Sequence, residues 1–224
     1  MQERETNCSK LVVLTAHGLG NPPDWMLPVN HEMWLEAARL KEVLSLPAPQ
    51  VLLTFDDGFA SCWDIAVPAL IDRGLRAKFF VTTMHIGQPG YLSGENLRSM
   101  VSHGMEIGSH GKCHRPWRGL DSKALEEEIF EAKDRLEQML GASVTEAACP
   151  FGAYDRRSLS ALRKAGMMRV YTSDRLPVRP DDWLVPRYTL RASDTLEDWR
   201  RIVGGHEPPL VWPQRLKVAV KRWR

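Results

Sequence analysis

Two adjacent aspartates, Asp56 and Asp57, follow the apolar run at residues 51–55. Neighbouring carboxylates repel each other and are costly to bury unless a cation pairs with one of them. Further along the chain, His110 and His114 stand four positions apart, again just after an apolar run. One carboxylate and two imidazoles can hold a divalent metal and leave a position for water, while the second carboxylate serves as a base. The four side chains together predict metal-assisted hydrolysis.

The two aspartates are expected to have different roles. Side chains of consecutive residues at a strand end point in different directions, so both carboxylates cannot readily approach one metal. We predict that Asp57, His110 and His114 bind a divalent metal, with zinc as the first choice. Asp56 then stays free to accept a proton. Neither motif alone would predict a metal site, because Asp-Asp-Gly is common in turns and spaced histidines are common in surface loops.

Strand-like and helix-like patterns alternate along the chain and would place these side chains at strand ends. Apolar runs predict strands at residues 11–15, 51–55, 77–82, 105–108, 145–149, 168–172 and 184–190. The expected helix N-caps are Asn30, Ser93, Asp121 and Asp155. This alternation predicts an α/β fold with a largely parallel sheet of barrel type, whose active site lies at the carboxyl ends of the strands.

Three separated motifs resemble those of one known family. They are Thr54-Phe55-Asp56-Asp57-Gly58, Ser109-His110-Gly111-Lys112-Cys113-His114 and Pro150-Phe151-Gly152-Ala153-Tyr154-Asp155. In order and spacing they resemble the leading motifs of polysaccharide deacetylases (the NodB-homology group, carbohydrate esterase family 4), over roughly residues 11–190. The resemblance implies a distorted (β/α)7 barrel, with Asp56 as catalytic base and the three residues named above as metal ligands. It also implies that the backbone N–H of Phe151 helps to stabilise the oxyanion.

The chain departs from the family pattern in two places. The arginine that normally steadies the base precedes the proline of the third motif by two residues, and here that position is Ala148. Either another group holds Asp56, or its reactivity is less finely tuned. The C-terminal Leu-x-His motif that supplies the general acid is not evident, and His206 matches it poorly.

His17 is the better candidate for the general acid. It follows the first predicted strand. The chain resembles the poly-N-acetylglucosamine deacetylase subgroup in this leading segment, and that subgroup has an acid histidine at such a position. The structural alternative is a capping or loop histidine.

Other side chains near predicted strand ends are candidates for contact with a sugar. The expected substrate-binding residues are Pro150, Gly152, Tyr154, Asp174 and Trp183. Trp25 and Trp117 could stack on a sugar ring as Trp183 could, although any of the three could instead pack in the core.

Composition bounds the partners and the location. The 224-residue chain has a net charge of +2, which is too small to predict nucleic-acid binding. Its four cysteines form no C-x-x-C pair, and its polar N-terminus resembles neither a signal peptide nor a membrane span, so we expect a cytoplasmic protein. We divide it into a catalytic domain, residues 1–207, and a basic amphipathic tail, residues 208–224. The tail could contact the anionic inner face of the membrane or pack as an ordinary last helix.

These residues together predict a metal-dependent carbohydrate N-deacetylase acting on an N-acetylated glycan or glycan precursor. Water on the metal would attack the amide, Asp56 would take its proton, and His17 would protonate the leaving amine. Two alternatives stay open. The basic tail favours an amidase acting on a lipid-linked or small non-polymeric N-acyl substrate. Ala148 and the missing C-terminal histidine motif favour a non-catalytic carbohydrate-binding homologue, whereas the intact aspartates and histidines argue against it.

Overall fold

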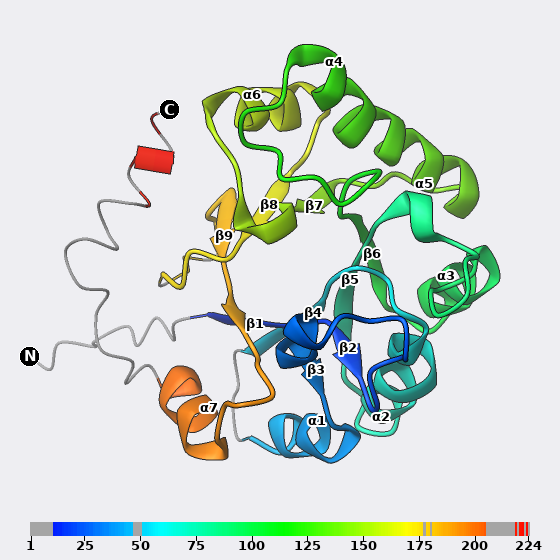
Figure 1. Cartoon of the computed structure of the whole chain (residues 1–224), viewed down its shortest axis with the longest axis vertical. Helices are drawn as coiled ribbons and strands as arrows, with labels where there is room; N and C mark the ends of the chain where they lie inside the picture. Colours follow the sequence, from blue (N-terminus) through cyan, green and yellow to red (C-terminus); the bar gives the residue numbers. More distant parts are fainter. Residues whose placement is uncertain are drawn as a thin grey trace, which may run out of the picture.

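The computed structural model describes residues 11–46, 51–176, 178–179 and 181–204, together with Val218, Val220, Lys221 and Trp223 of the tail. One sheet curves around a central axis in this part of the chain (Figure 1), and every pairing between its neighbouring strands is parallel. In pairing order, its strands are β10 (Tyr188–Thr189), β1 (Val12–Ala16), β4 (Val51–Phe55), β5 (Ala77–Val81), β6 (Glu106–Ser109), β7 (Glu146–Ala148), β8 (Arg169–Thr172) and β9 (Leu184–Pro186).

One segment closes the barrel. Only Arg187 separates β9 from β10, and β9 pairs with β8 whereas β10 pairs with β1. Residues 184–189 therefore act as a single strand that joins the two ends of the sheet and leaves seven strand positions around the axis. The distorted (β/α)7 barrel that the family resemblance implied is confirmed.

Alternation along the strands divides the side chains between the barrel interior and the helix layer. Val13, Phe80 and Tyr171 come from β1, β5 and β8 and pack together inside the barrel. Leu14 and Phe79, one residue out of phase with them, belong to the larger core beneath the helices. Because strand side chains alternate between faces, every second residue of β4 continues the interior face toward its carboxyl end.

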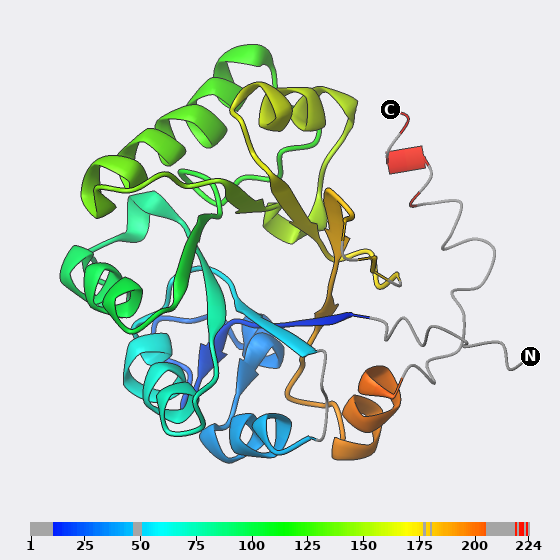
Figure 2. The same ribbon diagram turned by 180° about the vertical axis from the view of Figure 1, so that it is seen from behind.

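Helices lie around the outside of the curved sheet (Figures 1 and 2) and cover its outer face, whereas its inner face lines the barrel interior. They are α1 (Ala37–Leu44), η2 (Cys62–Ala66) with α2 (Val67–Ile71), α3 (Gly94–Ser102), α4 (Ser122–Leu125) with η4 (Glu126–Glu131) and α5 (Ala132–Leu140), α6 (Arg156–Lys164) and α7 (Leu196–Val203). Short 3₁₀ turns lie in the connections, at η1 (Pro28–Met33), η3 (Thr83–His85) and η5 (Pro150–Gly152).

Three of the four expected N-caps are confirmed. The side chains of Ser93, Asp121 and Asp155 accept hydrogen bonds from the backbone N–H three residues later, at 3.1, 2.8 and 2.9 Å. Each satisfies an N–H that has no partner within its helix.

The expected helix beginning at Asn30 is wrong. Residues 28–33 form the 3₁₀ turn η1, and Trp34 and Leu35 form β3 (Trp34–Leu35), which pairs with β2 (Gly18–Leu19). Both side chains of β3 are buried, and a Cβ on Gly18 would lie 1.9 Å from the Trp34 ring. Burial of Trp34 against this glycine outweighs the helical spacing of the apolar residues, and the helix α1 begins at Ala37 instead.

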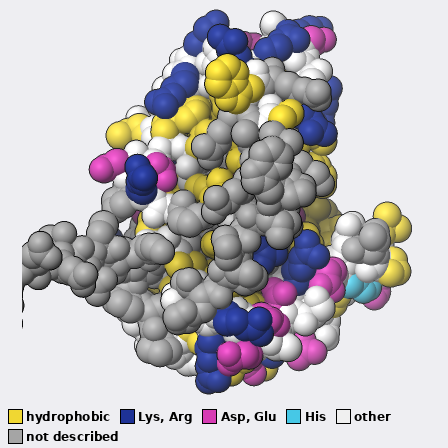
Figure 3. Space-filling model, turned by 90° about the vertical axis from the view of Figure 1, so that its left-hand side faces the viewer, with side chains coloured by type: hydrophobic (Ala, Val, Ile, Leu, Met, Phe, Trp, Pro, Cys, Tyr) yellow, Lys and Arg dark blue, Asp and Glu magenta, His cyan; other side chains and the backbone are white. Residues whose placement is uncertain are grey.

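The surface charges and the hydropathy of the helices can be examined in the described part of the chain. Lys and Arg side chains lie in separate groups on the face shown in Figure 3, with Asp and Glu beside several of them. Among the described helices, none combines the length and the apolar character that crossing a bilayer requires.

Candidate metal centre and catalytic site

The carboxyl ends of the parallel strands bring the predicted catalytic residues together. Asp56 and Asp57 follow β4, and His110 follows β6. Asp57 and His114 each adopt a left-handed backbone conformation, with φ of 73° and 56°. Such values are uncommon for residues with a side chain and concentrate at functional sites.

Asp57, His110 and His114 form a compact donor set. Oδ1 of Asp57 lies 3.4 Å from Nε2 of His110 and 3.2 Å from Nε2 of His114, and the three donor atoms all lie within 4.8 Å of one another. This carboxylate oxygen is buried without a hydrogen-bond partner among the described residues. A buried charged oxygen needs a cation or a donor, so the set fits a divalent metal.

A second contact orients His110 toward this position. Its Nδ1 lies 2.8 Å from the backbone carbonyl oxygen of Ala148, so Nδ1 carries the proton and donates it to that oxygen. Nε2 is thereby left with its lone pair toward Asp57. Metal-binding histidines are typically oriented in this way by a carbonyl or carboxylate.

The loop that carries both histidines is held by a buried glutamate. Glu128 is fully buried in η4 and accepts hydrogen bonds from the backbone N–H groups of Lys112 and Cys113, each at 3.1 Å. Gly111 leaves room for it, because a Cβ there would lie 2.6 Å from Oε2 of Glu128. The π-helical turn η4 that presents Glu128 is a rare element often found at functional sites. Glu128 therefore positions the loop between the two histidines.

Arg187 pairs with Asp56 inside the barrel. Nη1 donates to Oδ1 at 2.7 Å and Nη2 donates to Oδ2 at 2.6 Å. The two side chains are 1% and 4% exposed, so this two-point contact is shielded from water. Nη1 also donates to the hydroxyls of Thr15 and Thr54, at 3.2 and 3.0 Å.

Sequence reasoning missed Arg187. It lies between β9 and β10, far from Ala148 in sequence, and the barrel closure brings its guanidinium to the base. The only signal was a charged residue in the middle of an apolar predicted strand, residues 184–190, which has to be paired if it is buried. Of the two alternatives that Ala148 raised, the structure favours the one in which another group holds Asp56.

The electrostatics keep both carboxylates ionised. Burial alone would raise the pKa of Asp56, but the charges of Arg187 and His110 lower it below its ordinary value. Burial would also raise the pKa of Asp57, but its close contact with His110 and the nearby histidine charges lower it. Burial and the charge of His110 lower the pKa of His114 to about 4. At neutral pH, His114 is therefore neutral and can donate a lone pair.

His17 lies at the same rim. It follows β1 directly and is half-buried, and its Nδ1 is buried without a hydrogen-bond partner among the described residues. Its charge is close enough to lower the pKa of both Asp56 and Asp57. His206, the weaker candidate for the acid, lies outside the described residues.

The third motif forms the turn η5 beside the histidines. Phe151 has a left-handed φ of 57°, and its exposed ring lies 4.5 Å from the ring of His114. Pro150 and Gly152 on either side of it are buried. The turn therefore places Phe151 against His114 of the donor set.

Asp174 and Tyr154 lie behind this turn. The Tyr154 hydroxyl donates to Oδ2 of Asp174 at 2.6 Å, and Lys221 of the tail donates to Oδ1 at 2.9 Å. Lys221 also donates to the carbonyl of Gly152 at 3.2 Å. The Asp174 side chain is fully buried, so in this structure these residues support the turn rather than line an open surface.

The three candidate tryptophans have different environments. Trp117 is fully buried in the core between the sheet and the helices. Trp183 precedes β9, and its Nε1 donates to the carbonyl of Met167 at 2.8 Å while Arg163 covers its ring at 3.6 Å. Because the strands are parallel, Trp183 lies at the end of the barrel opposite to Asp57 and is not brought to the site. Trp25 is 53% exposed.

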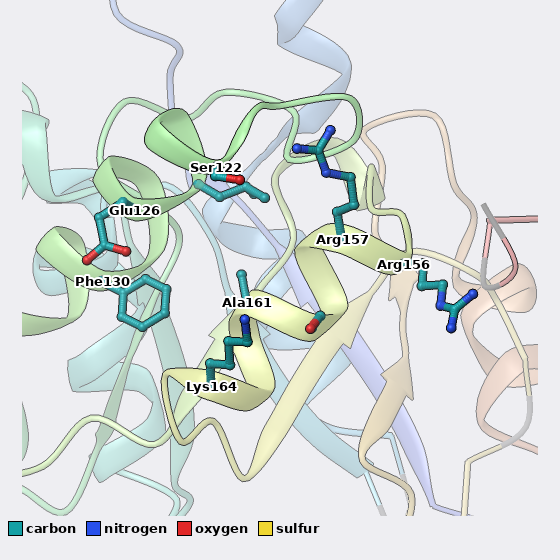
Figure 4. A pocket seen from close by; sticks show the side chains of 9 residues that line it. Ser122, Glu126, Phe130, Arg156, Arg157, Ala161 and Lys164 are labelled. Atoms are coloured by element: carbon teal, nitrogen blue, oxygen red, sulfur yellow. The ribbon is translucent and has the colours of Figure 1, made fainter.

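A separate cavity lies on the outside of the barrel. It has a volume of about 400 Å³ and is lined by residues of α4, η4 and α6, among them Glu126, Arg156, Arg157 and Lys164. Arg156 and Arg157 point in different directions (Figure 4), so they do not converge on one ligand. No residue of the donor set lines this cavity, so the cavity is separate from the candidate metal centre.

The amino-acid sequence is similar to those of several curated deacetylases. A poly-beta-1,6-N-acetyl-D-glucosamine N-deacetylase of Staphylococcus epidermidis is 26% identical over 178 residues, which cover 72% of this chain and 61% of that protein. A chitooligosaccharide deacetylase of Sinorhizobium fredii is 30% identical over 141 residues, which cover 62% of each chain. The chain spans between half and two thirds of the length of the curated relatives it matches.

The fold and the sequence family agree as well. The solved structure of the Streptococcus pyogenes deacetylase PplD in complex with acetate superposes with a TM-score of 0.76 at 19% identity, covering 89% of this chain and 99% of that chain. The sequence model of the family described as polysaccharide deacetylase matches residues 44–170, which is more than half of the chain. The chain therefore belongs to the polysaccharide deacetylase family.

Proposed function

We propose that this protein is a metal-dependent N-deacetylase that removes the acetyl group from N-acetylated amino sugars of a polysaccharide or its fragments. One observation carries the proposal: a buried Asp57 oxygen without a hydrogen-bond partner faces two histidine nitrogens, beside a second aspartate paired with a buried arginine. The names of the staphylococcal and rhizobial relatives support the same substrate class.

The donor set would hold a divalent metal, with zinc as the first choice, because one carboxylate and two imidazoles suit it. The metal would supply Lewis-acid polarisation of the amide and an acidified water when bound.

The chain's own residues would carry the remaining steps. Oδ2 of Asp56 lies 3.8 Å from Nε2 of His110, within reach of a water beside the donor set. Arg187 keeps this carboxylate ionised and fixes its orientation, so Asp56 can accept a proton. The backbone N–H of Phe151 would donate to the oxyanion, and His17 would protonate the leaving amine.

The case for a non-catalytic homologue is weakened by this site. It depended on the missing C-terminal histidine motif and on Ala148, because a base without a steadying arginine would be poorly tuned. Arg187 supplies a guanidinium from a different strand.

The test compares acetate release from N-acetylglucosamine oligomers with metal content. Asp56→Asn should abolish turnover while the protein still binds metal, because the base does not belong to the donor set. His114→Ala should lose both metal and turnover, because it removes a ligand. His103→Ala is the matched control, since His103 is an exposed histidine that ends α3. Retained turnover in Asp56→Asn would sink the proposal.

Location and membrane contact stay predictions. A cytoplasmic protein whose tail, residues 208–224, binds the inner face of the membrane should sediment with anionic vesicles only when the tail is present. Equal sedimentation with and without the tail would exclude this role.

A further inference from the structure

The described part of the C-terminal tail reaches the turn η5. Nζ of Lys221 donates to Oδ1 of Asp174 at 2.9 Å and to the carbonyl of Gly152 at 3.2 Å, and it lies 5.5 Å from the centre of the Tyr154 ring. The lysine side chain is 27% exposed and the aspartate side chain is 0% exposed. The contact is therefore largely shielded from water, unlike an ordinary surface ion pair.

Lys221 lies on the side of the tail helix that faces away from solvent. Val218 and Lys221 are three positions apart and so share a helix face. Val218 is buried and Lys221 is half-buried, whereas Val220 and Trp223 are 38% and 84% exposed. The described tail residues thus divide into a docked face, which carries the lysine, and a free face.

The turn η5 has a backbone that its surroundings must hold. Phe151 and Gly152 are consecutive left-handed residues, with φ of 57° and 59°. A residue with a side chain keeps this costly conformation only where the rest of the structure fixes it. The Phe151 ring is 68% exposed, so its own packing fixes the turn only in part. Gly152 lies close on Ser173, where a Cβ would stand 2.9 Å from the serine Cβ. The turn therefore rests on residues 173–174, and Lys221 ties the two segments together.

We propose that Lys221 is a positioning residue for the reaction: by bridging Asp174 and the carbonyl of Gly152, it aligns the neighbouring backbone N–H of Phe151 with the oxyanion. Donors to an oxyanion accelerate a reaction when they are held in place beforehand. The tail then belongs to the catalytic unit, and the boundary expected at residue 207 does not separate two independent parts. This inference rests on the proposed function, in which that N–H stabilises the oxyanion.

The first test is the variant Lys221→Met, which keeps much of the side-chain length but cannot donate a hydrogen bond. For acetate release from N-acetylglucosamine oligomers, kcat should fall about 10- to 100-fold, as for a misaligned catalytic group. KM should not change, because the interaction acts only in the transition state. Metal content should not change either, because Asp174, Gly152 and Tyr154 lie outside the donor set. Lys123→Met is the matched control at an exposed lysine of α4, and it should keep the wild-type kcat. A wild-type kcat in Lys221→Met, or a loss of turnover that follows a loss of metal, would overturn the inference.

A double variant separates positioning from folding. Lys221→Met leaves Asp174 buried without its cation, which lowers stability by itself. Asp174→Asn/Lys221→Met removes both charges and should restore the melting temperature. Its kcat should nevertheless stay at the level of Lys221→Met, because the carbonyl of Gly152 still lacks its donor. Recovery of kcat together with the melting temperature would mean that the lysine only neutralises a buried charge, and would overturn the inference.

Hydrogen exchange separates this inference from the proposed function. The backbone N–H groups of Gly152 and Ala153 donate to the carbonyls of Cys149 and Pro150 within the turn, at 2.9 and 3.0 Å. Their exchange should be about 10-fold faster in Lys221→Met, the change expected when one hydrogen bond to a charged group is lost. If wild type released no acetate, the proposed function would fail while these rates still decided whether Lys221 holds the turn. Equal rates in the two proteins would overturn the inference alone.

Discussion

Replacing Arg187 with methionine tests the central electrostatic contact of the site. Methionine has a similar length and no charge, so Asp56 would remain buried without a cation. Removing one partner of a buried ion pair costs about 3–5 kcal/mol. Water cannot solvate the unpaired carboxylate, because the Arg187 and Asp56 side chains are 1% and 4% exposed. The loss is large against the roughly 5–15 kcal/mol that stabilises a typical domain.

The loss should depend on pH, and Asp56 determines its sign. In the wild type the folded pKa of Asp56 is lowered, so the pair stabilises the protein above the unfolded pKa of about 3.9 and stops doing so as the pH falls through the folded pKa. In Arg187→Met, burial acts without the opposing guanidinium and raises the folded pKa. The difference in unfolding free energy should therefore be small in acid and largest at neutral pH.

Urea unfolding of the metal-free proteins at several pH values measures this difference. The double variant Asp56→Asn/Arg187→Met is the matched control, because it removes both charges and should recover most of the lost stability. Activity of Arg187→Met should fall about 10- to 100-fold, with its acid limb moved to higher pH, since a misplaced base loses part of its contribution. A stability loss under about 1 kcal/mol at neutral pH, or one that does not vary with pH, would refute the pairing argument.

Two further predictions concern the metal. Glu128→Gln should weaken metal binding about 10- to 100-fold, because a neutral amide holds the histidine loop less well than a carboxylate does. Competition with a chelator measures the metal affinity. The control Asp134→Asn, at an exposed position of α5, should leave that affinity unchanged. Metal binding should release a proton and tighten as the pH rises. Burial alone would lower the pKa of His110, but Asp56 and Asp57 raise it. His110 must lose this proton before it can bind the metal, because only the neutral imidazole is a ligand. Calorimetry in buffers of different ionisation enthalpy detects that proton, and an affinity independent of pH between about 6 and 8 would contradict it.

Local signals predicted the elements that depend on neighbouring residues. The caps at Ser93, Asp121 and Asp155 follow from short polar side chains that satisfy the first free N–H groups of a helix, and all three are present. The helix predicted from Asn30 is not formed. Its predicted apolar face included Trp34, which is instead buried against Gly18 in a contact between two separate segments of the chain. Periodicity does not distinguish these outcomes.

The candidate site also contains residues that local sequence signals could identify and residues that they could not. Asp56, Asp57 and the two histidines could be proposed from the sequence, because their residue types suit metal and proton chemistry and they come after β4 and β6. Trp183 could not be placed, since a residue beside a strand may stand at either end, and only the direction of β9 puts it opposite to the donor set.

The sequence by itself determined the donor set, the family and the alternation of strands and helices, because these depend on residue types and on spacing along the chain. The tertiary structure alone decided how Asp56 is held. Residues 184–189 pair with β8 and then with β1, and this closure carries Arg187 into the barrel from a strand remote in sequence. A buried carboxylate requires a cation, but the chain that supplies it is specified by the register of the whole sheet.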